Sequence, residues 1–147
     1  MKYDTFKVLI VDDSLVNRKL LASIVHKAIG CNILLANDGN AALQMTKDEL
    51  PDLILLDIMM PGMDGFAVAE HLQANEETAH IPIIFITALT DEANKVRGFE
   101  KGGRDYVTKP FNKKEILARI KLQLELKQHV EQVETLNKNF TEELILA

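Results

Sequence analysis

The sequence has 147 residues, of which 47% are hydrophobic and 27% are charged, a composition typical of a globular rather than a disordered protein. Its net charge of −5 argues against a general nucleic-acid-binding protein, so we expect no direct nucleic-acid contact. Cys31 is the only cysteine, which excludes an intrachain disulfide and favours a reducing compartment. No apolar run approaches the roughly 20 residues of a membrane-spanning helix. The N-terminus also lacks the layout of a signal peptide, so we expect a cytoplasmic protein with no membrane partner.

Five short apolar runs alternate along the chain with segments of helical spacing. The runs predict strands at residues 8–11, 33–36, 53–56, 83–86 and 106–107. The first, third and fourth runs do not alternate polar with apolar residues, which is typical of strands that are covered on both faces in a parallel sheet. Apolar stripes predict the five intervening helices, and these stripes comprise Val16, Leu20 and Ile24; Ala41, Ala42 and Met45; Phe66, Ala69 and Leu72; Ala93 and Val96; and Ile116, Leu117, Ile120 and Leu124. This order predicts an α/β fold, a doubly wound five-stranded parallel sheet with helices on both faces.

The sequence changes character from about residue 123, because residues 123–147 contain neither Gly nor Pro. Apolar residues recur there at alternating four- and three-residue steps if Asn137 fills one step. They form a seam along one side of the helix, which comprises Leu126, Val130, Val133, Phe140 and Leu144. Leu122 and Leu136 lie beside this seam. This pattern predicts that the last helix is extended as a coiled-coil-like linker. The alternative is a plain amphipathic helix that folds back on its own domain. We therefore expect a domain over residues 1–122 and a linker over residues 123–147 that leads to a further output domain.

Polar residues follow four of the predicted strands at the point where each strand ends. Asp12 and Asp13 follow the first strand, Asp57 the third, Thr87 the fourth and Lys109 the fifth. Because the carboxyl ends of parallel strands lie at one edge of a sheet, these side chains should converge. Three carboxylates repel one another and one lysine cannot neutralise them all, so the cluster predicts a cation. Oxygen ligands without His or Cys favour Mg²⁺ or Mn²⁺ over Zn²⁺.

A metal beside a carboxylate, a lysine and a threonine predicts a phosphoryl-transfer site. Asp57 would attack phosphorus and form an acyl phosphate, while Lys109 offsets charge on the transferring oxygens and Thr87 donates a hydrogen bond to one of them. The main-chain carbonyl of Met59 would add a metal ligand, and Met59 and Leu89 would restrict water. The sequence has no Gly-x-x-x-x-Gly-Lys loop, so we expect no bound nucleotide.

Each residue taken alone also has a structural explanation. Asp13 and Ser14 can both start a helix. Thr87 is an ordinary strand residue, Lys109 can be a solvated lysine, and Tyr106 can be a packing residue of a strand. The combination of these residue types at the ends of different strands is therefore more specific than any one of them.

Four segments, "KVLIVDDS", "PDLILLDIMMPGMDGFAV", "IPIIFITA" and "GGRDYVTKPF", resemble the receiver domain of two-component response regulators over roughly residues 5–125. The resemblance implies a flavodoxin-like fold with strand order 2-1-3-4-5. It also implies that Asp57 is the phosphoacceptor and that Asp12 and Asp13 hold Mg²⁺ together with Asp57 and the Met59 carbonyl. Family members often have Glu-Asp in place of Asp12-Asp13, and the shorter acid still supplies an oxygen.

The resemblance further implies that Thr87 and Lys109 bind the phosphoryl group and that Thr87 and Tyr106 form the conformational switch. The peptide bond between Lys109 and Pro110 is usually cis in the family. The expected function is a phosphoacceptor signalling module that is not an enzyme with a separate substrate, since it catalyses only its own phosphorylation and dephosphorylation. Phosphorylation would shift the face made by the fourth helix, fifth strand and fifth helix. The expected partners are a sensor histidine kinase or phosphotransfer protein, and an output domain or second protomer reached through the C-terminal helix.

Other functions remain open at this point. A Mg²⁺-dependent phosphatase of the haloacid-dehalogenase kind also uses an Asp nucleophile, but it needs a second acid two residues later, where this chain has Met59. A flavin- or nucleotide-binding module on the same fold would need a glycine-rich loop after the first strand, and that loop is acidic here. A degenerate receiver that acts only as a protein-interaction module is disfavoured by the complete set of acids, Thr87 and Lys109.

Overall fold

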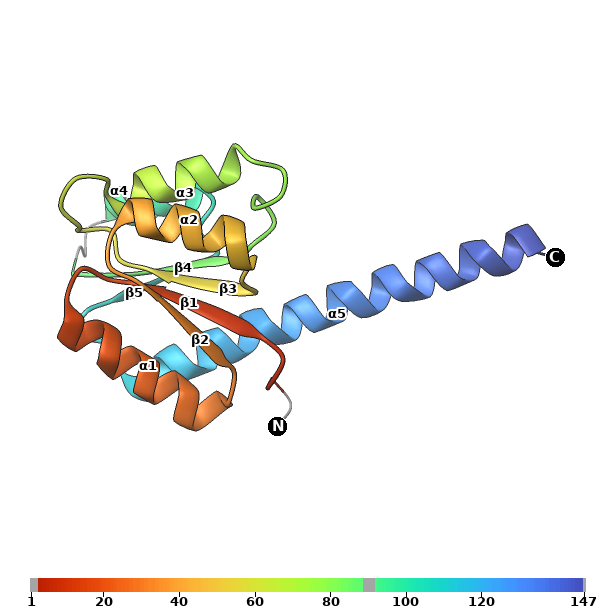
Figure 1. Ribbon diagram of the computed structural model, residues 1–147, viewed down its shortest axis with the longest axis horizontal. Helices are drawn as coiled ribbons and strands as arrows, with labels where there is room; N and C mark the ends of the chain where they lie inside the picture. Colours follow the sequence, from red (N-terminus) through yellow and green to blue (C-terminus); the bar gives the residue numbers. More distant parts are fainter. Residues whose placement is uncertain (1–2, 89–91, 147) are drawn as a thin grey trace.

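The computed structural model describes residues 3–88 and 92–146. In chain order the elements are β1 (Lys7–Val11), α1 (Leu15–Ile29), β2 (Asn32–Ala36), α2 (Gly39–Glu49), β3 (Leu53–Leu56), α3 (Gly65–Gln73), β4 (Ile83–Thr87), α4 (Glu92–Glu100), β5 (Asp105–Thr108) and α5 (Lys113–Leu146). Within this described part, five strands form one parallel sheet in the order β2-β1-β3-β4-β5 (Figure 1). The predicted α/β fold and its strand order are therefore confirmed.

Helices cover both faces of the sheet, and the strand side chains alternate between two hydrophobic clusters. Leu9 and Val11 of β1 belong to the cluster under α2 and α3, while Val8 and Ile10 belong to the cluster under α1 and α5 (Figure 1). Every residue of β3 and β4 is buried. These strands show no polar alternation because neither of their faces meets water.

In the part of the chain that the structure describes, four helices begin after a residue whose side chain accepts a hydrogen bond from the first turn, and Asn112 is that residue for α5. Ser14 caps α1, Asp38 caps α2 and Asp64 caps α3. Such caps satisfy backbone N–H groups that have no partner within the helix. Helices α1 and α2 begin within four residues of the end of the preceding strand, whereas α3 begins nine residues after β3.

The buried face of α1 differs from the sequence prediction. Leu21, Val25 and Ile29 are buried, whereas Val16 is 75% exposed and Leu20 is 49% exposed. The predicted stripe was wrong by one residue. This helix carries apolar residues on more than one side, so two neighbouring stripes have the same spacing and only the tertiary contacts decide between them.

The predicted stripe of α4 was also wrong. Val96 is 52% exposed, Ala93 is exposed, and Gly98 is the buried residue of this helix. A Cβ atom at Gly98 would lie 3.1 Å from Cδ2 of Phe85 and 3.4 Å from Cδ2 of Tyr106. The helix therefore approaches the sheet through a glycine, which a search for large apolar residues does not detect.

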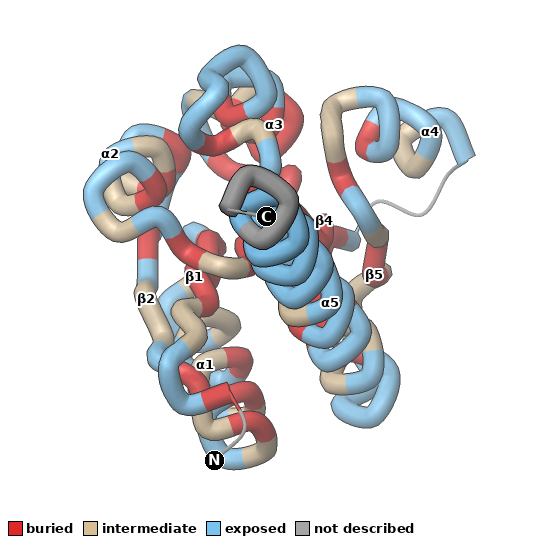
Figure 2. Tube along the Cα trace, turned by 90° about the vertical axis from the view of Figure 1, so that its right-hand side faces the viewer, coloured by how far each residue is buried: buried red, intermediate tan, exposed pale blue. Residues whose placement is uncertain are grey.

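Helix α5 is a single helix of 34 residues. Its first part packs on the sheet through Ile116, Ile120 and Leu124, as predicted. Lys127 then forms an ion pair with Asp52, the residue before β3. Beyond this point the helix runs away from the sheet rather than folding back on it, and residues 129–142 are exposed (Figures 1 and 2).

The remainder of the predicted seam can be followed as far as Phe140, which is 61% exposed. Leu144 belongs to the same predicted seam, and its side chain lies outside those that the structure describes. Within residues 3–88 and 92–146, no helix has both the length and the apolar character that crossing a bilayer requires.

Candidate functional site

The carboxyl edge of the sheet brings together the polar residues that the sequence placed at strand ends. Asp12 follows β1, Asp57 follows β3, Thr87 is the last residue of β4, and Lys109 follows β5. The backbone N–H of Lys109 donates a hydrogen bond to the carbonyl of Thr87 at 2.7 Å, so the last two strands remain paired up to the site. The predicted convergence is therefore present in the structure.

Three aspartates form an acidic cluster at this edge. Asp12, Asp13 and Asp57 each offer one carboxylate oxygen, and these oxygens lie within 4.8 Å of one another. Asp12 is 2% exposed and Asp57 is 4% exposed, whereas Asp13 lies in contact with solvent. Like charges this close and this poorly hydrated repel one another strongly, so the cluster has the donor set and the charge that a bound metal ion requires.

Lys109 reaches into the acidic cluster from the loop after β5. Its Nζ lies 2.8 Å from Oδ2 of Asp12 and 3.2 Å from Oδ2 of Asp57. One ammonium group offsets one of the three carboxylate charges, so negative charge remains for a cation to balance. The hard oxygen donors fit Mg²⁺ or Mn²⁺.

Backbone hydrogen bonds fix the orientation of the two buried carboxylates. Oδ1 of Asp12 accepts a hydrogen bond from the N–H of Ser14 at 2.8 Å, and Oδ1 of Asp57 accepts one from the N–H of Met59 at 3.2 Å. Each carboxylate therefore turns its other oxygen toward Lys109. The carbonyl of Met59 stays a predicted metal ligand.

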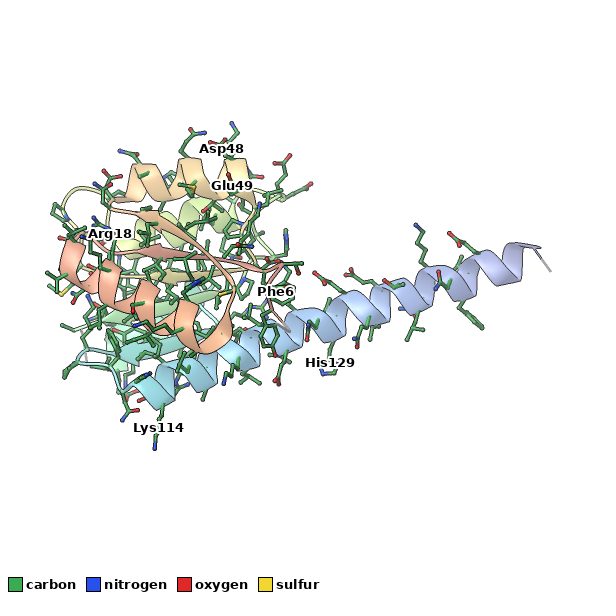
Figure 3. All side chains as sticks on the ribbon, turned by 60° about the horizontal axis from the view of Figure 1, so that its bottom comes forward. Phe6, Arg18, Asp48, Glu49, Lys114 and His129 are labelled. Atoms are coloured by element: carbon green, nitrogen blue, oxygen red, sulfur yellow. The ribbon has the colours of Figure 1, made fainter. Side chains whose placement is uncertain are left out.

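Arg18 is a contributor to the site that the sequence interpretation missed. Its Nη1 donates a hydrogen bond of 2.7 Å to the main-chain carbonyl of Asp12. Figure 3 labels this side chain on α1. The contact ties the first turn of the helix to the end of β1 and holds the acidic pair in place. The sequence signal for this contact was an arginine in the first turn of a helix that begins just after two aspartates.

Burial is the main influence on the protonation of Asp57. Desolvation raises the pKa of this carboxyl group, the charge of Lys109 opposes the rise, and the charge of Asp12 adds to it. For Lys109, burial alone would lower the pKa, but its hydrogen bond to Asp12 and the charge of Asp57 outweigh burial and raise it. The lysine is therefore a permanent cation, while the ionised form of Asp57 gains from any further positive charge.

The hydroxyl group of Thr87 is buried without a hydrogen-bond partner among the described residues. A buried hydroxyl without a partner costs about 1–3 kcal/mol. This group therefore favours a ligand oxygen at the edge of the site. Its role in holding a phosphoryl group stays a prediction.

Tyr106 is 8% exposed and belongs to a row of aromatic residues beneath α4. Its ring centroid lies 6.4 Å from that of Phe85, which in turn lies 5.6 Å from that of Phe66. The guanidinium carbon of Arg97, on α4, lies 4.3 Å from the centroid of the Phe66 ring. These contacts connect α4 with β4 and β5 close to Thr87, and the switch role of Tyr106 stays a prediction.

The loop after Asp57 is held close to the site by its glycines. Gly62 has a φ of 75°, which lies in the left-handed region that favours glycine. A Cβ atom at Gly65 would lie 2.3 Å from the carbonyl oxygen of Asp57, so α3 can begin this close only with glycine at its first position. Met59 is 56% exposed at the rim, and Leu89 lies outside the described residues.

The peptide bond between Lys109 and Pro110 is cis, as the family resemblance implied. Residues 8–121 match the family model of the response regulator receiver domain. Over 115 residues, the chain is 44% identical to the "Probable transcriptional regulator ycf27" of Guillardia theta and 42% identical to "Response regulator PleD" of Caulobacter vibrioides. Each alignment covers 78% of this chain but 44% and 25% of these two relatives, so the chain spans less than half of their length.

Solved structures agree with the sequence match. CheY4 of Vibrio cholerae, a chemotaxis protein, is 30% identical with a TM-score of 0.75, and the alignment covers 80% of this chain and 97% of that chain. The receiver domain of Francisella response regulator 1452 is 31% identical with a TM-score of 0.72, and here 84% of this chain and 99% of that chain are covered. The chain described here therefore belongs to the response regulator receiver domain family.

Proposed function

We propose that this chain is a Mg²⁺-dependent phosphoacceptor in which Asp57 receives a phosphoryl group from a histidine kinase, a phosphotransfer protein or a small phosphodonor. The observation that carries the proposal is the meeting of three carboxylates, Lys109 and the Thr87 hydroxyl, which has no partner among the described residues, at one edge of the sheet. Membership of the receiver family supports the same function.

Asp12, Asp13 and Asp57 would hold the ion, together with the main-chain carbonyl of Met59. When bound, Mg²⁺ supplies positive charge to the phosphoryl oxygens in the transition state. Mn²⁺ has the same preference for oxygen ligands and would act in its place. The ion would also balance the repulsion between Asp12 and Asp57 that Lys109 offsets only in part.

In the reaction, an oxygen of Asp57 attacks phosphorus in line with the leaving group. A new P–O bond forms, and the bond between phosphorus and the donor breaks, with its electron pair leaving on the histidine nitrogen or on the acetate oxygen. Lys109 neutralises charge on the transferred group, and Thr87 donates a hydrogen bond to one of its oxygens. The product is an acyl phosphate on Asp57, and the chain catalyses no reaction beyond forming and hydrolysing it.

The phosphoryl group would act as a signal by drawing the Thr87 hydroxyl toward it. This movement would change the space available to Tyr106, which packs with Phe85 beneath α4. We expect the face made by α4, β5 and α5 to shift as a result. The shift would reach an output domain or a second protomer through α5.

The test is incubation with acetyl phosphate and Mg²⁺, followed by intact mass measurement. The wild-type chain should gain one phosphate, and the gain should be absent in Asp57→Ala and in the presence of a chelator. Asp64→Asn is the matched control, since it removes a carboxylate outside the cluster and keeps an oxygen that can cap α3. If Asp57→Ala is phosphorylated as well as wild type, or if neither chain gains mass, the chain is a degenerate receiver or uses another acceptor.

A further inference from the structure

The distal part of α5 carries an apolar stripe that the domain leaves uncovered. Its residues are between 47% and 67% exposed, and they are Leu126, Val130, Val133, Leu136 and Phe140. A helix that leaves its domain with such a stripe in water needs a partner surface, because apolar area gains stability only when it is buried.

The stripe leaves the domain along its length. Leu126 and Val130, at its start, line a hollow together with His80, Pro82 and Arg104 of the domain. Leu124 is buried against the sheet, and Val133 follows it by nine residues. At about 3.6 residues per turn, nine residues are two and a half turns, which puts Val133 on the opposite side of the helix. A partner helix can therefore lie along Val133 and Phe140, in the part of α5 that extends beyond the other elements (Figure 1).

We propose that this stripe is the seam of a parallel, in-register coiled coil with a second copy of the same chain. Leu126, Val133 and Phe140 take one set of core positions of the heptad repeat, and Val130 and Asn137 take the other. Leu136 flanks this seam.

Asn137 selects both the partner and the direction of the pair. In a parallel pair in register, Asn137 lies opposite the partner's Asn137, and the two amide groups can hydrogen-bond to each other. In the antiparallel pair with the longest overlap, Asn137 lies opposite the partner's Val133, and the amide is buried without a hydrogen-bonding partner. A polar residue at one core position is a known means of fixing the register of a coiled coil.

The charges beside the seam favour the same arrangement. The parallel pair places His129 opposite the partner's Glu134, so the acid faces an imidazole rather than another carboxylate. The antiparallel pair places Glu134 beside the partner's Glu134, and like charges repel.

Disulfide trapping tests the direction of the pair, because Cys31 is the only native thiol and is buried. Under a mild oxidant, Val130→Cys should form a covalent dimer. Gln132→Cys, exposed on the helix away from the seam, should not. An antiparallel pair would instead crosslink a mixture of Val130→Cys and Phe140→Cys chains and leave each single variant monomeric, which would overturn the proposal.

Sedimentation of the full chain without oxidant tests the pairing itself. The wild type should show a monomer–dimer equilibrium, and Val133→Glu should weaken dimerisation by about tenfold or more. Gln132→Glu adds the same charge off the seam and should leave the equilibrium unchanged. A wild-type chain that stays monomeric at high concentration, or a dimer that Val133→Glu leaves intact, would refute the proposal. Asp57→Ala should dimerise like the wild type, so this outcome is separate from the failure of phosphorylation.

Discussion

Replacing Lys109 with Met removes the cation that lies between two buried carboxylates and leaves the rest of the site in place. At an effective dielectric constant of about 20, unit charges separated by 2.8 and 3.2 Å attract by about 6 and 5 kcal/mol. Desolvation of the ions offsets much of this attraction, and removing one partner of a buried ion pair costs about 3–5 kcal/mol. The Lys109 side chain is 19% exposed, so we expect the low end of that range, about 3 kcal/mol.

Thermal unfolding in chelator and in excess Mg²⁺ measures this effect. In chelator, Lys109→Met should unfold about 10 °C below wild type. Mg²⁺ should raise the melting temperature of the variant more than that of wild type, because the ion no longer competes with the lysine for Asp12 and Asp57. Arg119→Met, which removes an ion pair with Asp105, is the control and should lose the same stability under both conditions. If Mg²⁺ also left the difference in melting temperature between Lys109→Met and wild type unchanged, the lysine and the metal ion would not share the same carboxylates, and the reasoning would be wrong.

Three further predictions concern single positions at the same edge of the sheet. Burial raises the pKa of Asp57, so its ionised form destabilises the metal-free fold as pH rises through that pKa. Asp57→Asn should therefore be more stable than wild type in chelator at neutral pH. The advantage should disappear below about pH 4, the usual range of a carboxyl pKa, and equal denaturation midpoints at every pH would contradict this. Thr87→Val removes a buried hydroxyl that has no partner among the described residues, so the unphosphorylated protein should keep its stability or gain about 1 kcal/mol. Its phosphorylation by acetyl phosphate should slow by tenfold or more, because the hydrogen bond to the phosphoryl group is lost. Thr87→Ser should keep the rate, and a normal rate in Thr87→Val would refute the assigned role. Gly65→Ala places a Cβ atom against the Asp57 carbonyl and should lower the free energy of unfolding in denaturant by about 2–3 kcal/mol. A Cβ atom in the control Gly62→Asn meets no neighbouring atom, and this variant should lose about 1 kcal/mol or less. Equal losses in the two variants would show that the close approach at residue 65 is unimportant.

The sequence by itself determined the class of fold and the location of the site. Apolar runs without alternation mark β1, β3 and β4 because a strand covered on both faces has no polar side. Asp12, Asp57 and Lys109 could be placed at one edge because parallel strands all end there, so a position along the chain fixes a position in space.

The tertiary structure decided which side of each surface helix is buried and how closely the elements approach. Residues of α1 give two similar apolar stripes, and only packing selected Leu21 for the core, whereas α4 approaches the sheet through Gly98. Contacts such as Arg18 on the Asp12 carbonyl, and Gly65 against the Asp57 carbonyl, join a side chain or backbone to a main-chain oxygen. Every residue carries such an oxygen, so an arginine early in a helix marks a possible donor but not the oxygen that it meets, and only the folded chain shows where the contact forms.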